Sequence, residues 1–264
     1  MIFAAMYGYD PLTFFLYVLF TLIAVVIGLV SHEVAHGLVA KWNGDYTAKN
    51  MGRLSLNPIK HFDPIGFVMM MFVGFGYAKP VPINPGNFKN YRRGIITVSI
   101  AGIVMNLIVA FFAVMIGCLL YFGMYNVGSE KAFEALFYFA EMFRIISRVN
   151  LSLAFFNLLP IYPLDGFKLV EACTHRGNKY CAFMRTNGKY LLYGLVLLGI
   201  IVSMAFNYVS NIPYWFEYFD ILGTYINICA NAVTWVFTSF WGVIIHGYRQ
   251  ILLFLFIFRY GGIV

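Results

Sequence analysis

The chain is dominated by apolar runs that are long enough to cross a lipid bilayer. A spanning helix needs about 20 mostly apolar residues, and residues 11–30 and 94–124 reach this length without a charged side chain. Residues 133–160, 190–206 and 221–245 are three further candidates. Only 11% of the chain is charged, against about a quarter of a soluble domain. We therefore predict an all-α polytopic membrane protein.

Two apolar stretches are too short to span as helices. Residues 64–78 end in a segment rich in Gly and Pro, and we interpret them as a re-entrant hairpin, because irregular backbone at membrane depth needs protein around it. Residues 251–258 fit either an interfacial segment or an extension of the fifth helix. Alternating polar and apolar residues at 53–56 suggest one or two short β-strands. We expect about five to six transmembrane helices, with a re-entrant hairpin and short β-strands in the 43–93 loop.

The charged residues between the spans predict the orientation of the chain. Basic residues are concentrated in segments 41–93 and 161–190, whereas the alternate connections are mainly acidic. The positive-inside rule places the two basic segments in the cytoplasm and the N-terminus outside. The N-terminal residues lack the basic region of a signal peptide, so we expect the first span to be retained. The basic residues form no stripe or arm, which excludes a nucleic-acid partner.

The first span ends in a cluster of ionisable residues, His32, Glu33 and His36. Residues four apart on a helix lie on one face, about 6 Å apart along the axis, so the two imidazoles can reach one ion. This is the H-E-x-x-H pattern of two zinc ligands and a general base. Zinc lowers the pKa of a bound water towards about 7, and the carboxylate takes its proton. Ionisable residues in a span are costly and mark function, which favours a metal site over a chance match.

A catalytic zinc site needs a third protein ligand and an open position. Asp165 in "NLLPIYPLDG" is the best candidate, because Pro160 and Pro163 end the third span and leave Asp165 at the cytoplasmic face. A helix N-cap is an equally good explanation of this aspartate, and the residues alone do not decide between the two. The other histidines are interpreted as solvated or interfacial: His61, His175 and His246.

Taken together, "HEVAH" and "NLLPIYPLDG" resemble the site-2 protease family of intramembrane zinc metalloproteases, peptidase family M50. "GRLSLNPIKHFDPIG", "GFGYAKPVPINPGNFKN" and "SIAGIVMN" resemble its compact bacterial branch, which lacks PDZ and CBS domains. The resemblance covers roughly residues 26–172, and the last two spans match nothing that we can name. It implies one Zn²⁺ per chain, held by His32, His36 and Asp165. Glu33 would then activate the attacking water.

The resemblance also suggests roles for four asparagines. Asn157 would bind the oxyanion or the substrate backbone, although a structural hydrogen bond between helices explains it nearly as well. Asn106 follows the family's "AG…N" pattern, in which Ile103 stands where relatives usually carry proline. Asn84 and Asn87 lie in a segment that is beside the active site in the family, where extended backbone could pair with an unwound substrate strand. We therefore take Asn106, Asn84 and Asn87 as substrate-binding candidates.

These observations predict one membrane-embedded metalloprotease domain over residues 1–264, with a catalytic core at about 11–172 and accessory helices at 186–258. We expect an intramembrane zinc endopeptidase that acts in regulated intramembrane proteolysis, in a bacterial plasma membrane, with its active site near the cytoplasmic face. Its partners would be a transmembrane protein substrate and the lipid bilayer; a regulatory membrane partner or a homo-oligomer is left open. The alternative is a non-hydrolytic polytopic metal-binding protein or transporter, which would not need Glu33.

Overall fold

The computed structural model describes residues 10–64, 66, 78–124, 126–175, 177–208 and 219–246. Within these ranges every regular element is a helix, and none is a β-strand. The elements are, in chain order, α2 (Pro11–Trp42), α3 (Thr47–Asn50), η1 (Pro58–Lys60), η2 (Pro85–Asn87), α5 (Tyr91–Met124), α6 (Glu130–Leu158), α7 (Asp165–Cys173), α8 (Lys179–Tyr208) and α9 (Ile221–His246). The all-α prediction is therefore confirmed for the described part of the chain.

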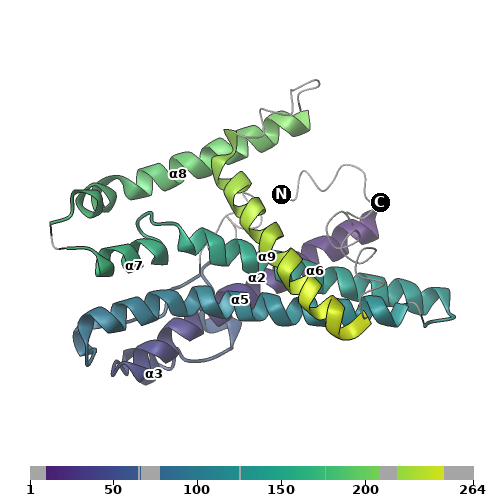
Figure 1. Cartoon of the computed structure of the whole chain (residues 1–264), viewed down its shortest axis with the longest axis horizontal. Coiled ribbons are helices and arrows are strands. Elements are labelled where there is room, and N and C mark those ends of the chain that lie inside the picture. The colour runs from purple at the N-terminus through teal and green to yellow at the C-terminus, as the bar shows by residue number, and fades with distance from the viewer. Residues whose placement is uncertain are drawn as a thin grey trace.

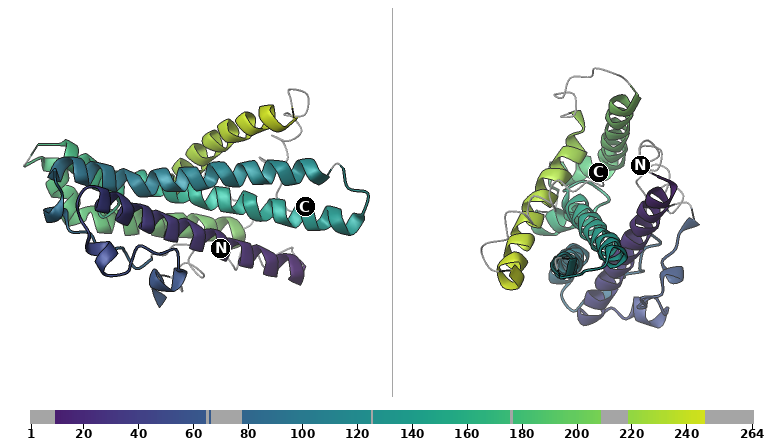
Figure 2. Two further views of the ribbon diagram at one scale, coloured as in Figure 1. Left: turned by 90° about the horizontal axis from the view of Figure 1, so that it is seen from below. Right: turned by 90° about the vertical axis from the view of Figure 1, so that its right-hand side faces the viewer.

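Helices α2, α5 and α6 form the centre of the molecule and run side by side along its long axis (Figures 1 and 2). Helix α5 is antiparallel to the other two. Ala24 of α2 and Ala113 of α5 are fully buried where they meet Ile145 and Ile146 of α6. Small side chains at such a junction let helices approach closely when lipid provides no hydrophobic drive for association. The metal-binding candidates lie farther along this bundle, towards the end where α2 finishes.

Among the described residues, four helices are long and apolar enough to cross a membrane: α2, α5, α8 over Lys179–Ala205, and α9 over Ile221–Ile245. Helix α6 has 29 residues, which is sufficient length, but it carries several charged side chains and is not in this set. A fifth span over α6 stays a prediction. The expected hairpin at 64–78 lies mostly outside the described residues, as does the segment 251–258.

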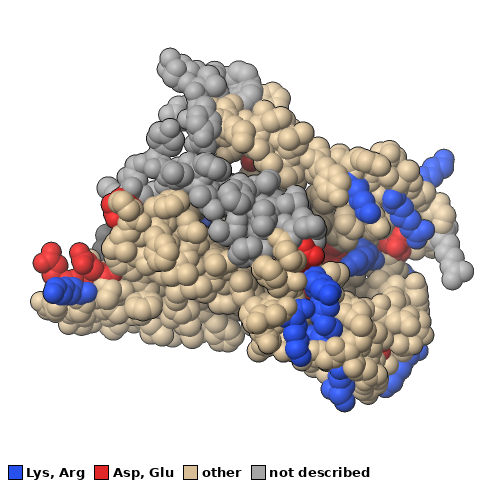
Figure 3. Space-filling view, turned by 180° about the vertical axis from the view of Figure 1, so that it is seen from behind, with Lys and Arg blue, Asp and Glu red and all other residues tan. Residues whose placement is uncertain are grey.

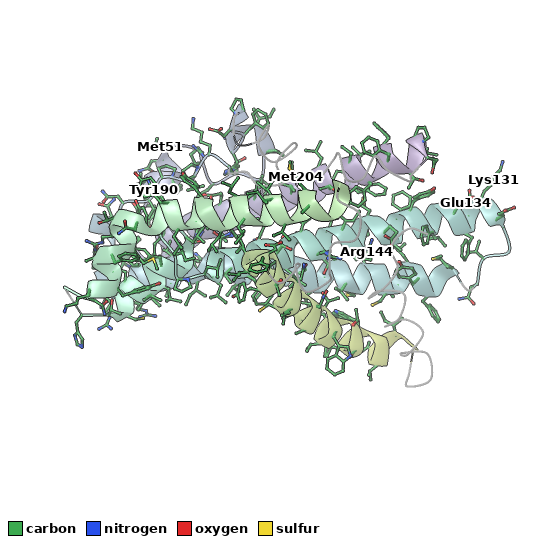
Figure 4. The ribbon with its side chains drawn as sticks, turned by 90° about the horizontal axis from the view of Figure 1, so that it is seen from above. Met51, Lys131, Glu134, Arg144, Tyr190 and Met204 are labelled. Atoms are coloured by element: carbon green, nitrogen blue, oxygen red, sulfur yellow. The ribbon has the colours of Figure 1, made fainter. Side chains whose placement is uncertain are left out.

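The charges of α6 are partly neutralised inside the bundle. The Arg144 guanidinium donates to both carboxylate oxygens of Glu141, with Nη2–Oε2 at 2.6 Å. The Tyr121 hydroxyl of α5 donates to Glu141 Oε1 at 2.8 Å. Figure 4 shows Arg144 well back along α6 from the tip that bears Lys131 and Glu134. Because Glu141 is only 2% exposed, this group joins α5 to α6 in the interior.

The prediction of β-strands in the 43–93 loop is wrong for its described residues, which contain α3 and the 3₁₀ turns η1 and η2 and no strand. The Asp45 carboxylate accepts the Thr47 amide at 3.1 Å and so starts a helical turn. The alternating stretch at 53–56 forms no strand ladder within the described residues, and it meets segment 79–80 through the Arg53 guanidinium, which donates to the carbonyl oxygens of Lys79 and Pro80. Alternation is a property of one segment, whereas a strand needs a ladder partner.

Helix α8 begins at Lys179, eleven residues before the apolar span that we expected to start at Tyr190. Its added turns are amphipathic, and Cys181 and Met184 pack against Leu164 and Phe167. The start of α8 therefore covers the segment in which α7 begins.

Candidate metal centre

His32 and His36 lie one turn apart on the same face of α2, and both are 6% exposed. Their Nε2 atoms are 3.0 Å apart, and their rings meet edge to face. Helix α2 runs unbroken through both residues and ends at Trp42, ahead of the turn at Gly44, whose φ is +106°. The helical spacing expected from the sequence therefore brings the two imidazoles together.

Asp165 is the third member of this group. Its Oδ2 lies 3.2 Å from His32 Nε2 and 3.0 Å from His36 Nε2. It is the first residue of α7, but its side chain does not cap that helix; Oδ1 instead accepts from Lys168 Nζ at 2.9 Å. A Cβ at Gly166 would stand 2.1 Å from the Leu158 carbonyl oxygen, so only glycine lets the start of α7 fold back against the end of α6.

The three donor atoms suit a zinc ion. Tetrahedral coordination with bonds of about 2.0 Å separates the donors by about 3.3 Å, close to the 3.0–3.2 Å found here. His36 Nδ1 lies 2.7 Å from the Val98 carbonyl oxygen, the outer contact that a metal-bound histidine usually makes. A carboxyl group that binds a metal must be ionised, and the Lys168 ammonium at 2.9 Å from Oδ1 favours this form of Asp165.

Glu33 lies beside this group and outside it. The side chain is half-buried, and its Oε2 accepts the backbone N–H of Val81 at 2.8 Å. A Cβ at Gly37 would meet Leu54 Cδ2 at 2.4 Å and Val81 Cγ1 at 3.0 Å, so the loop packs directly on the adjoining turn of α2. One oxygen of the Glu33 carboxylate is therefore fixed by the loop backbone.

Helix α5 packs directly against the His32 ring at Gly102. A Cβ at Gly102 would stand 2.5–2.6 Å from ring atoms Cε1, Nδ1 and Nε2 of His32. Asn106, one turn farther along α5, is 0% exposed. The absence of a side chain at Gly102 therefore lets α5 pack directly against the His32 ring.

The other three asparagines with predicted roles, Asn157, Asn87 and Asn84, form hydrogen bonds within their own helix or loop. Asn157 Nδ2 donates to the Leu153 carbonyl oxygen of its own helix at 2.9 Å. Asn87 Nδ2 donates to Asp45 Oδ1 at 2.9 Å, and Asn84 Oδ1 accepts the Gly86 amide at 3.0 Å. The substrate-binding role of Asn84 and Asn87 stays a prediction, and their observed contacts shape the loop.

Asp45 organises this loop and was missed by the sequence analysis. The residue is 0% exposed, and its Oδ2 accepts the Asn84 amide at 2.7 Å. Burial acts to raise the pKa of Asp45, but hydrogen bonds from Thr47, Asn87 and the Asn84 backbone lower it below the usual value. The sequence "NGDYT" at 43–47 predicts a turn that contains Asp45. It does not predict the hydrogen bond to Asn84, 39 residues farther along the chain.

Two histidines outside the group have described side chains. His61 was expected to be solvated or interfacial; it is not solvated, because it is 2% exposed and its Nε2 lies 2.8 Å from the Ser55 carbonyl oxygen. His175 is exposed, as expected. Neither is part of the His32–His36–Asp165 group.

Comparison with known proteins agrees with this geometry. The chain is 44% identical over 163 residues to "Putative zinc metalloprotease YwhC" of Bacillus subtilis (strain 168), an alignment that covers 62% of this chain and 71% of that protein. The chain belongs to peptidase family M50. The model of this family, described as "Peptidase family M50", matches residues 121–200, a range that contains Asp165 but neither histidine. No solved structure matches the chain. Membership of family M50 makes zinc the metal implied for the His32–His36–Asp165 group.

Proposed function

We propose that this chain is an intramembrane zinc endopeptidase, which hydrolyses peptide bonds within or next to transmembrane segments of membrane proteins. One observation carries the proposal: two histidines and an aspartate converge within 3.2 Å, beside a glutamate, on helices of a membrane protein. A non-hydrolytic metal-binding protein or transporter would need the three ligands but no general base beside them. The metalloprotease relative favours hydrolysis.

In this proposal His32, His36 and Asp165 hold the zinc, which when bound lowers the pKa of a water and polarises the scissile carbonyl. Glu33 accepts a proton from the water as the water oxygen bonds to the carbonyl carbon. Glu33 then passes this proton to the amide nitrogen as the carbon–nitrogen bond breaks. The backbone N–H of Val81 donates to Oε2 of Glu33, so this hydrogen bond fixes the orientation of the carboxylate. Asn157, at the end of α6, is the candidate for binding the substrate carbonyl.

A substrate helix must unwind before it is cut, because a membrane helix keeps its carbonyl groups hydrogen-bonded within itself. The segment 79–84 lies beside Glu33 through the Val81 contact. Its extended backbone is our candidate for pairing with the unwound strand, with Asn84 and Asn87 shaping that segment.

We place the active site near the cytoplasmic face of a bacterial plasma membrane, with the N-terminus outside. In support, Lys and Arg side chains gather at one end of the long axis, whereas a small mixed group of charges marks the other end (Figure 3). The positive-inside rule assigns the basic end to the cytoplasm. A single domain is also proposed, with a core at about 11–172 and accessory helices at 186–258, because the start of α8 packs on the segment that leads into α7.

The test compares cells that make the native protein with cells that make Glu33→Gln. The variant should retain zinc in the purified protein, because Glu33 is not a ligand, and should abolish cleavage of membrane proteins detected by comparing the two membrane proteomes. His36→Ala should lose both zinc and cleavage. Native cleavage products in the Glu33→Gln cells would refute the endopeptidase assignment, and zinc binding without any cleavage by the native protein would favour the metal-binding alternative.

A further inference from the structure

The two histidines of the metal centre differ in how their second ring nitrogen is held. His36 Nδ1 contacts the Val98 carbonyl oxygen at 2.7 Å. His32 Nδ1 is buried and finds no hydrogen-bond partner in the described part of the chain. Metal-bound histidines almost always donate this N–H, because the outer bond fixes the tautomer and the ring orientation. An N–H at His32 Nδ1 therefore needs a hydrogen-bond acceptor, which the hydrogen bonds of the described residues do not provide.

Asn106 also has buried side-chain atoms that lack hydrogen-bond partners. It is 0% exposed, and neither its Oδ1 nor its Nδ2 has a hydrogen-bond partner among the residues that the structure describes. A buried amide without partners is destabilising, so such a residue calls for an explanation.

The helix geometry directs Asn106 towards His32. Gly102 is the point of α5 that touches the His32 ring, and Asn106 follows it by four residues on the same face. Side chains of a helix lean towards its N-terminus, so a residue covers the turn before its own Cα. We therefore expect the Asn106 amide to lie over the turn of Gly102. Cβ positions four residues apart are about 5–6 Å apart, a gap that one amide or one amide and a water closes.

We propose that Asn106 is a positioning residue for the metal centre: its Oδ1 accepts the N–H at His32 Nδ1, directly or through one water, and leaves Nε2 free for the zinc. This inference rests on the proposed function. It gives Asn106 a role other than the substrate contact expected from the sequence, since a fully buried side chain offers no surface to a peptide.

The experiment measures zinc affinity by competition with a chelator, using the full-length protein in detergent with Glu33→Gln as the parent to prevent self-cleavage. Asn106→Leu keeps the volume but removes the acceptor, and should weaken zinc binding about 10- to 100-fold, the usual effect of losing an outer contact. Asn106→Asp keeps the acceptor and should bind zinc as the parent does. Co²⁺ absorption of the same proteins should change for Asn106→Leu and return for Asn106→Asp. If Asn106→Leu does not fold, Asn106→Ala should show the same loss.

Asn150→Leu is the matched control. Asn150 is also 0% exposed and has an unpartnered Oδ1, but that atom faces Gly28, where a Cβ would stand 3.2 Å from it. Its zinc affinity should equal that of the parent. Parent-like affinity in Asn106→Leu or Asn106→Ala, or equal weakening in Asn150→Leu, would overturn the inference and leave the proposed function intact. If the parent binds no zinc, or if His36→Ala binds as tightly, both are overturned.

Discussion

The close packing of Gly102 against His32 makes a strong prediction about metal binding. An alanine there would put its Cβ 2.5–2.6 Å from three atoms of the imidazole ring. Non-bonded carbon contacts are favourable at about 3.5 Å or more, so the ring must retreat by about 1 Å. A displacement of this size changes the distances from His32 Nε2 to the donor atoms of His36 and Asp165, which are 3.0 and 3.2 Å.

A displacement of about 1 Å is roughly five times the tolerance of a metal–ligand distance, about 0.2 Å. We expect Gly102→Ala to weaken zinc binding at least about 100-fold, since it disturbs a ligand itself and contacts around ligands are already worth about 10- to 100-fold. Cleavage of a membrane substrate should fall at least as far, because misplacement by about 1 Å alone costs about 100-fold in rate. Chelator competition in detergent and zinc content after dialysis measure the first effect.

Gly123→Ala on the same helix is the control. The nearest atom to a Cβ at Gly123 is Leu136 Cδ1 at 3.8 Å, an ordinary contact, and alanine favours a helix by up to about 1 kcal/mol over glycine. This variant should bind zinc normally and be at least as stable as the parent. If Gly102→Ala also bound zinc normally, the His32 ring would not be clamped between α5 and the other two ligands, and the reasoning would fail.

Two further predictions concern the loop contact and the buried ion pair. Val81→Pro removes the N–H that Glu33 accepts, at a position that Pro82 already restricts to extended backbone. The rate of cleavage should fall about 10-fold, which is part of the 10²–10⁴-fold that a general base contributes. The variant should retain zinc, and the control Val81→Ala should cleave at the native rate. Equal rates for the proline and alanine variants would contradict this. Glu141→Gln leaves Arg144 without its charge partner and should destabilise the protein by about 3–5 kcal/mol, measured by thermal unfolding in detergent. Adding Arg144→Gln should recover most of the loss, and a double variant as unstable as the single one would argue against an uncompensated charge.

The long helices were predictable because hydropathy and helix breakers are local properties. Helix α2 ends at Trp42, ahead of the "NGD" turn, as the sequence indicates. Helix α8 begins at Lys179, eleven residues before the apolar span expected at 190–206, because its first turns are amphipathic and pack against Leu164 and Phe167 where α7 begins. The strand prediction failed for a similar reason, since alternation does not reveal whether a pairing partner exists.

For the metal centre, local spacing was enough to bring His32 and His36 together, because both lie on one helix. The approach of Asp165 to them depended on a fold-back at Gly166, which no periodicity encodes. The contacts of Gly102 with His32, and of Val81 with Glu33, join segments that are far apart in the chain. Such contacts follow from helix packing, and they become visible only in the assembled structure.

The separation of the ligands along the chain also bears on how the enzyme is made. His32 and Asp165 are 133 positions apart, with all of α5 and α6 between them. A nascent chain that has reached only the end of α5 carries His32 and His36 but not Asp165. Under the proposed function, the zinc site would be incomplete until α6 and the start of α7 have left the ribosome. A protease assembled in this order would stay inactive beside the translocation machinery during the first part of its synthesis.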